Sequence, residues 1–118
     1  MRGLTIDLRT HDDVVVASLN GEIDLVNHEQ AGAEILTTAL DSGPRLVIDF
    51  QNVSYVDSNG VRMLFGVARE LDHSRVEWTV ALGEQSPLKA LFKVTTFDEV
   101  ARVFETLEDA LGALSGQG

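Results

Sequence analysis

The residues best placed to do chemistry are the polar run Asp57-Ser58-Asn59-Gly60, which falls between a strand pattern and a strong helix pattern. A serine at the start of a helix can act as a nucleophile or can cap the helix. The free N–H groups of a helix N-terminus also favour an anion such as phosphate. Gly60 costs about 1 kcal/mol in a helix relative to alanine, and its missing side chain would let a partner's backbone or a nucleotide come close. The competing interpretation is that Ser58 is only an N-cap and Gly60 only a packing glycine.

Hydrolytic and metal-dependent chemistry are not expected from the remaining polar residues. A nucleophile elbow needs a glycine two residues before its serine, and Val56 stands at that position relative to Ser58. None of His11, His28 and His73 has a second metal ligand four residues further on, so the sequence predicts no metal site. The absence of cysteine excludes disulfides, thiol catalysis and cysteine-based metal clusters.

The chain also lacks the residues of two common phosphate sites, the Walker-type loop and the receiver-type phosphoacceptor aspartate. The chain has no Gly-Lys-Ser or Gly-Lys-Thr, which a Walker-type phosphate loop requires. A receiver-type phosphoacceptor aspartate needs an acidic Mg²⁺ cluster and a lysine at a strand end. Both lysines, Lys89 and Lys93, lie in a short helix pattern instead. We therefore expect no catalytic residue and no cofactor.

Length and charge narrow the class of protein further. The chain has 118 residues, with 9 basic and 19 acidic side chains and a net charge of −10. This length suits one domain, and the acidity disfavours nucleic acid and anionic membranes as partners. No apolar run approaches the roughly 18 residues of a membrane span, and the N-terminus lacks the apolar core of a signal peptide. A single cytoplasmic domain without direct membrane insertion is expected.

The N-terminal part of the chain reads as a hairpin, a helix and a buried strand. Apolar residues alternate over 4–8, and a continuous apolar run follows at 14–19, which predicts an antiparallel hairpin. The segment 20–24 breaks the strand pattern. Asn27 can then cap a helix, with Gln30 three residues on as in a capping box. The apolar run 46–50 is typical of a strand covered on both faces, and 51–56 reads as a loop.

The C-terminal part contains the clearest helix and a second alternation of strands and helices. Val61, Leu64, Phe65, Ala68 and Leu71 share one face of a helical period. The elements expected after it are a strand over 76–82, a short helix over 88–92 with Ser86 as N-cap, a strand over 100–104 and a helix over 107–114 that Thr106 opens.

This order, ββαβαβαβα, predicts one α/β domain over residues 1–114 with a flexible tail at 115–118. A hairpin followed by strand–helix alternation implies a mixed, mostly parallel sheet of about five strands, flanked by about four helices. Ser58 then lies near the carboxyl end of a central strand, where open α/β sheets present their functional groups.

The segment from Leu46 to Val61 resembles the signature of STAS domains, and more narrowly that of the bacterial anti-sigma factor antagonists. The pattern is an apolar strand, then Asp49-Phe50-Gln51-Asn52-Val53-Ser54-Tyr55-Val56-Asp57-Ser58-Asn59-Gly60-Val61, then an amphipathic helix. Gly21-Glu22-Ile23-Asp24 is similar to the Gly-Glu-Leu/Ile-Asp of that family, and 87–111 is similar to its closing strand and helix. Two departures are Asn59, where serine, threonine or alanine is usual, and Phe97, where relatives often have a glycine-containing turn.

The resemblance implies a partner switch rather than an enzyme. In this family the serine after the motif aspartate, here Ser58, is phosphorylated by a kinase that binds ATP and is also the anti-sigma factor. The unmodified antagonist binds that kinase and frees a sigma factor, and a serine phosphatase resets the cycle. The residues expected to contact the partner are Glu22, Asp24, Asp57, Ser58, Asn59, Gly60 and Arg62. The alternative is a STAS accessory subunit that docks on the ATPase of a lipid ABC transporter.

Charge supplies a physical reason for such a switch. A phosphate adds about −1.5 to −2 charge at pH 7; on Ser58 it would lie beside Asp57, and near Asp24 if the 21–24 loop lies alongside. Arg62, Arg69 and His73 share one helix face, which is either ordinary solvated surface or a patch that steers an acidic partner surface or nucleotide phosphates.

Overall fold

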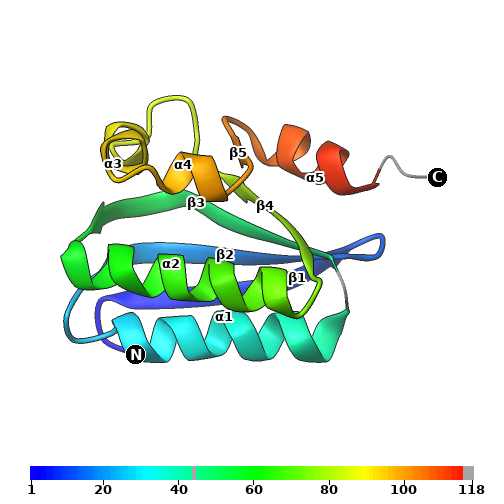
Figure 1. The fold of residues 1–118 in the computed structure, drawn as a ribbon, viewed down its shortest axis with the longest axis horizontal. Helices are drawn as coiled ribbons and strands as arrows, with labels where there is room; N and C mark the ends of the chain where they lie inside the picture. The colour runs from blue at the N-terminus through cyan, green and yellow to red at the C-terminus, as the bar shows by residue number, and fades with distance from the viewer. Residues whose placement is uncertain (44, 116–118) are drawn as a thin grey trace.

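Five strands form one mixed sheet in the computed structural model, which describes residues 1–43 and 45–115 (Figure 1). The strands are β1 (Leu4–His11), β2 (Val14–Ile23), β3 (Arg45–Val56), β4 (Glu77–Ala81) and β5 (Val103–Phe104). The helices are α1 (His28–Ser42), α2 (Ser58–His73), α3 (Leu88–Val94), α4 (Phe97–Val100) and α5 (Leu107–Ser115). The strands follow one another in chain order; β1 is antiparallel to β2, and the later pairs are parallel. The predicted fold class is confirmed.

The sheet is covered on both faces, which explains the continuous apolar run in β3. Figure 1 shows α1 and α2 side by side along one face and α5 on the opposite side. Leu46 and Ile48 belong to the larger core beneath α1 and α2, whereas Val47 between them packs with Ala110 and Leu114 of α5. Because side chains alternate along a strand, a strand between two helical layers must be apolar at successive positions.

The two central strands extend beyond their apolar runs, so the predicted break at 20–24 and the predicted loop at 51–56 are wrong. β2 continues to Ile23 and β3 to Val56, with residues 22 and 23 paired to Tyr55 and Val56. The pairing of β2 with β3 shifts register twice along the Asn20-Gly21 segment, each time with one extra residue in β3. The second half of β3 leaves polar side chains exposed while Val53 and Val56 remain buried. Its polarity therefore reflects partial cover by the helices and not the end of the strand.

A short helix in the described part of the chain was not predicted. The segment 97–100 forms α4, and the last strand contracts from the expected 100–104 to two residues. Phe97, the residue that departs from the family pattern, is buried and packs edge-on against Phe65 and Phe92, with ring centroids 5.3 and 4.9 Å apart. This aromatic cluster holds α4 over the end of the sheet and leaves little chain for β5.

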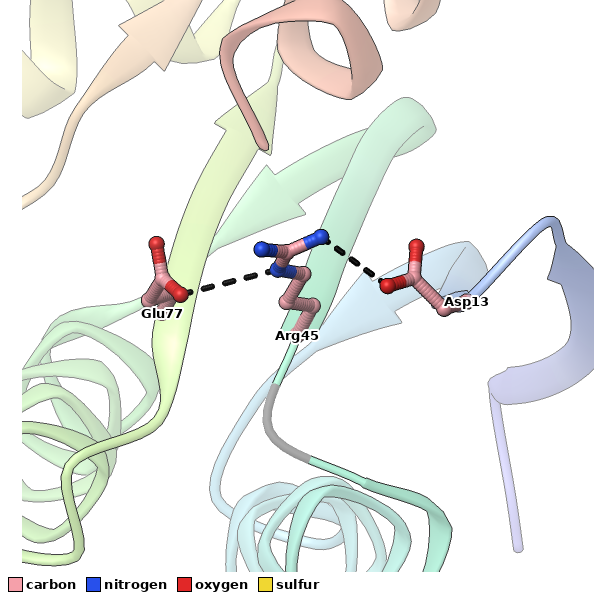
Figure 2. A network of polar contacts seen from close by, with 3 residues as sticks. All are labelled: Asp13, Arg45 and Glu77. Atoms are coloured by element: carbon pink, nitrogen blue, oxygen red, sulfur yellow. Dashed lines mark hydrogen bonds and ion pairs between the residues drawn. The ribbon is translucent and has the colours of Figure 1, made fainter. Parts of the chain in front are cut away.

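An ion network joins β3 and β4 to the turn between β1 and β2, at the end of the sheet remote from Ser58 (Figure 2). Arg45 at the start of β3 donates from Nη1 to Asp13 Oδ2 at 2.9 Å, and its Nε lies 3.5 Å from Glu77 Oε1 in β4. Exposed ion pairs of this kind contribute at most about 1 kcal/mol. The network fixes side-chain geometry more than it adds stability.

The last helix extends one residue into the segment that was predicted to be a flexible tail, 115–118. Ser115 is the last residue of α5, and the rest of the expected tail, 116–118, lies outside the described residues. Within the described ranges, every helix is too short or too polar to cross a membrane.

Candidate functional site

Ser58 is the first residue of α2, and its side chain is exposed at the junction between β3 and the helix. The interpretation of Ser58 as the N-cap is wrong, because Asp57 holds that position. Asp57 Oδ1 accepts a hydrogen bond from the Gly60 N–H at 2.9 Å. Among residues 1–43 and 45–115, the Ser58 hydroxyl has no hydrogen-bond partner. It is therefore accessible at a helix N-terminus without being needed to cap it.

Asp57 also joins the helix to the loop that follows β2. Its Oδ2 accepts from the Leu25 N–H at 3.1 Å, and its own N–H donates to the Ile23 carbonyl at 3.0 Å. Partial burial alone would raise the pKa of Asp57, but hydrogen bonds from Gly60, Asn59 and Leu25 outweigh it and hold that pKa below its ordinary value. The carboxylate is consequently ionised at neutral pH, immediately beside the serine.

The loop over residues 24–27 is held rigidly by its own side chains. Asp24 Oδ1 accepts from the Val26 N–H at 3.0 Å, and the Asn27 carboxamide accepts from the Asp24 N–H at 3.0 Å. Asn27 also donates to the Arg2 and Glu22 carbonyls, each at 2.8 Å, and only 1% of the residue is exposed. The predicted capping box is therefore wrong: Asn27 occupies the N-cap position of α1 but makes no side-chain cap bond. The loop does lie alongside Asp57, which accepts a hydrogen bond from Leu25 of this loop.

Gly60 is explained by the packing of the chain itself. A β-carbon built at Gly60 would lie 2.6 Å from Val56 Cγ1 and 2.8 Å from Ile23 Cγ2. Both neighbours are buried at the ends of β2 and β3. The space expected to admit a partner's backbone or a nucleotide is thus occupied by these two side chains. The glycine lets the first turn of α2 approach the sheet and so sets the position of Ser58.

Three large apolar side chains near Ser58 are exposed and were not among the predicted contact residues. Leu25 is 68% exposed, Val26 67% and Tyr55 52%. We call these three residues the apolar rim. Leu25 is linked through its N–H to Asp57, and Tyr55 lies two residues before Asp57 on β3. The available signal was an apolar pair directly after Asp24 in a connecting segment, where polar residues are usual.

The other predicted contact residues lie around this centre. Glu22 is exposed and pairs in register with Tyr55, so the two side chains belong to neighbouring strands. Asn59 is half-buried, and its side chain bonds to the Asp57 carboxylate, so asparagine extends the cap. Arg62 is exposed one helical turn after Ser58, which places both on the same face of α2.

The basic face of α2 continues away from the serine. Arg69 and His73 are exposed further along the helix, and neither they nor Arg62 form an ion pair with any described residue. The two arginines of this face, without an acidic partner, contrast with a net charge of −10 for the chain. In the same described ranges, no group of three or more acidic or histidine side chains could hold a metal ion.

Comparison with known proteins agrees with this geometry. The family model of the STAS domain matches residues 5–110. The anti-sigma-F factor antagonist RsfB of Mycobacterium tuberculosis is 30% identical over 113 residues, which are 96% of this chain and 91% of RsfB. An anti-sigma factor antagonist from Mycobacterium paratuberculosis superposes with a TM-score of 0.83 at 30% identity, over 94% of this chain and 93% of that one.

A further solved relative is the Bacillus anti-sigma factor antagonist SpoIIAA, which is 25% identical to this chain. Its unphosphorylated form superposes with a TM-score of 0.74 over 97% of this chain and 99% of SpoIIAA. Its phosphorylated form superposes with a TM-score of 0.66 over 93% and 99%. This chain is thus similar in sequence and fold to a protein for which both states have been solved.

Proposed function

This chain belongs to the STAS domain family of anti-sigma factor antagonists, and we propose that it is a partner-switching antagonist controlled by phosphorylation of Ser58. The observation that carries the proposal is the exposed Ser58 hydroxyl beside the apolar rim. This hydroxyl does not cap α2, because Asp57 does. In its unmodified form the protein binds an anti-sigma factor that is also a serine kinase, and a sigma factor is released. The protein acts as a binding module and kinase substrate, not as an enzyme.

The apolar rim supplies the attraction in this proposal. Fully burying a leucine, valine or similar side chain contributes roughly 1.5–3 kcal/mol, and Leu25, Val26 and Tyr55 are all more than half exposed. Hot spots of protein interfaces combine such apolar anchors with a polar surround. Glu22, Asp24, Asn59 and Arg62 provide polar groups around the rim. Gly60 contributes by positioning α2 and makes no contact of its own.

Phosphorylation reverses the attraction by local charge. The kinase holds ATP; the Ser58 Oγ attacks the γ-phosphorus, ADP leaves, and the hydroxyl proton passes to a base of the kinase. The product carries about −1.5 to −2 additional charge beside Asp57, whose lowered pKa keeps it ionised. Gly60, Asn59 and Leu25 already donate hydrogen bonds to the Asp57 carboxylate, so a phosphate on Ser58 cannot push the carboxylate aside without breaking the N-cap of α2. A partner packed on the rim must then desolvate two adjacent anions, and each 1.4 kcal/mol of that cost weakens binding tenfold.

The rest of the cycle follows from this chemistry. A serine phosphatase removes the phosphate and restores the binding form. The nucleotide is held by the kinase, so this chain needs no cofactor of its own. We place the cycle in the cytoplasm, and we expect neither nucleic acid nor direct membrane insertion, in keeping with the acidity of the chain.

The decisive test is phosphorylation by the anti-sigma factor kinases encoded in the same genome. Each purified kinase is incubated with ATP and this protein, and the mass of the intact chain is measured. We expect one phosphate on the wild type and none on Ser58→Ala. Ser54→Ala is the matched control, because Ser54 is also exposed and lies four residues earlier on β3. Retention of the phosphate by Ser58→Ala would overturn the proposal.

Binding tests the second half of the proposal. The same kinases are titrated with wild type, Ser58→Asp and Ser58→Ala in the absence of ATP. Ser58→Asp is expected to weaken binding at least tenfold with an unchanged midpoint of thermal unfolding, and Ser58→Ala to bind like the wild type. Equal affinities for all three proteins would contradict the charge mechanism. The transporter alternative is tested by a pull-down with the unmodified protein, which would then recover a transporter ATPase instead of a kinase.

A further inference from the structure

Among the described residues, the outer strand β1 has a neighbouring strand on one side of its backbone and none on the other. β1 is the first strand of the sheet order and pairs only with β2 (Figure 1). The Glu22 N–H donates to the Gly3 carbonyl at 2.9 Å, and hydrogen bonds alternate along an antiparallel ladder, so the odd-numbered residues of β1 bond to β2. The even-numbered residues therefore direct their N–H and C=O groups to the free edge. Such an edge is a template for pairing with another strand.

The side chains along the free edge of β1 would not prevent another strand from pairing with it. Leu8 is 55% exposed, and it lies beside a groove of about 470 Å³ between β1 and α1 whose apolar lining also includes Ile6 and Ala33. Asp7 and Arg9 flank Leu8 and are both exposed on the opposite face of the strand. Arg9 forms no ion pair with any described residue, and Asp7 accepts one hydrogen bond, from Asn20 at 3.2 Å. Exposed edges are usually protected by charged side chains, prolines or bulges. The segment 4–11 has no lysine, proline or bulge, and its charged pair Asp7 and Arg9 is of opposite sign, so these charges do not repel a second copy of the strand.

We propose that β1 pairs antiparallel with β1 of a second copy, with Leu8 on the twofold axis, so that two sheets join edge to edge. Because the free N–H and C=O groups belong to even-numbered residues, an even-numbered residue of one copy must lie opposite an even-numbered residue of the other. Centred on Leu8, this register places Asp7 of each copy opposite Arg9 of the other and sets Leu8 against Leu8 beside the groove. A shift of one residue on each strand would instead place Asp7 opposite Asp7, or Arg9 opposite Arg9. Opposite charges facing each other stabilise a cross-strand pair, and like charges destabilise it.

The pairing leaves the Ser58 site accessible. Ser58 follows β3, and β2 separates β3 from the free edge of β1. A twofold contact of this kind is isologous and closes on itself, so it yields a dimer rather than a fibre. One strand pair and one groove form a smaller contact than the roughly 1,200–2,000 Å² of stable interfaces. The dimer is therefore expected to be concentration-dependent, and it presents two Ser58 sites at once. This inference does not rest on the proposed function, because it concerns the unmodified protein alone.

A charge swap tests the pairing in sedimentation equilibrium of the purified full chain. The average mass of the wild type should rise from monomer toward dimer over a roughly hundredfold range of concentration. Asp7→Arg alone and Arg9→Asp alone should each weaken the dimer at least tenfold, and the double variant should restore it. Arg75→Asp, on the turn before β4, changes the charge equally and should leave the dimer intact. A wild type that stays monomeric throughout, or a double variant no better than the single ones, would overturn the proposal.

Crosslinking tests the register directly, since the chain has no cysteine of its own. Two Leu8 residues on the axis would have Cα atoms about 5.5 Å apart, within the span of a disulfide. Leu8→Cys should therefore form a covalent dimer with oxidised glutathione. Two Thr5 residues would lie about 20 Å apart along the paired strands, so Thr5→Cys should stay largely uncrosslinked. Equal crosslinking of the two variants would refute this register. Kinase assays on the same proteins measure phosphorylation of Ser58 independently of the dimer.

Discussion

Substituting Gly60 by alanine is the sharpest test of how the fold positions the serine. The new β-carbon would lie 2.6 Å from Val56 Cγ1, 2.8 Å from Ile23 Cγ2 and 3.3 Å from the Ile23 carbonyl oxygen. Carbon atoms in contact normally lie about 3.5–4.0 Å apart. Both neighbours are buried and β-branched, so neither can turn aside at low cost. Ile23 is constrained further because its carbonyl accepts the Asp57 N–H.

The magnitude follows from two opposing effects. Overpacking a buried position costs about 1–3 kcal/mol, whereas alanine in place of glycine inside a helix gains about 1 kcal/mol. Gly66 lies on the same helix, and a β-carbon there would meet nothing within 4 Å. Gly66→Ala should therefore stabilise the protein by about 1 kcal/mol. The difference between the two variants isolates the clash and should be about 1–3 kcal/mol.

Urea denaturation of the wild type and both variants measures this difference. The slope of the free energy of unfolding against urea should be the same for all three proteins, because the fold is unchanged. Relief of the clash in Gly60→Ala must move the first turn of α2 away from the sheet. A slower rate of Ser58 phosphorylation is therefore expected for this variant and not for Gly66→Ala. If Gly60→Ala stabilises the protein as much as Gly66→Ala, the close approach of α2 to the sheet is refuted.

Three further predictions concern the residues that support the site and the core. Because the pKa of Asp57 is lowered in the folded state, its charge stabilises the fold fully above the ordinary aspartate pKa of about 3.9. That contribution is lost as pH falls through the lower folded value, so the stability gap between wild type and Asp57→Asn should be constant near neutrality and shrink in acid. Asn27→Ala should cost about 2–3 kcal/mol by leaving buried backbone groups unpaired, against at most about 0.5 kcal/mol for the exposed Asn52→Ala in urea titrations. Leu64→Ala should lower the free energy of unfolding by about 2–5 kcal/mol, because Leu64 is fully buried; a loss below about 1 kcal/mol would place Leu64 outside the core.

Periodicity predicted most of the elements because it reports which face of each segment is buried. The apolar face of α2 was read correctly from the spacing of Leu64, Ala68 and Leu71, all of which are buried. Thr106 opens α5 as predicted, with its Oγ1 accepting from the Asp109 N–H at 3.0 Å. The same reasoning failed over 51–56, where β3 continues beneath incomplete cover, and over 97–100, where an aromatic cluster forms a helix without a periodic pattern. Periodicity cannot detect a helix or strand whose burial by neighbouring elements changes along its length.

The amino-acid sequence by itself determined the α/β order, the acidity and the Asp57-Ser58 motif at the start of the strongest helix, because these depend on neighbours along the chain. Only the tertiary structure decided which residue caps that helix, why Gly60 is needed and which apolar side chains stay exposed. The bond between Asp57 and Leu25 joins residues 32 positions apart. The exposure of Leu25 and Val26 likewise depends on how the buried Asn27 folds the loop between β2 and α1. Such contacts arise only when β2 and β3 pair side by side, and no local pattern of residues encodes them.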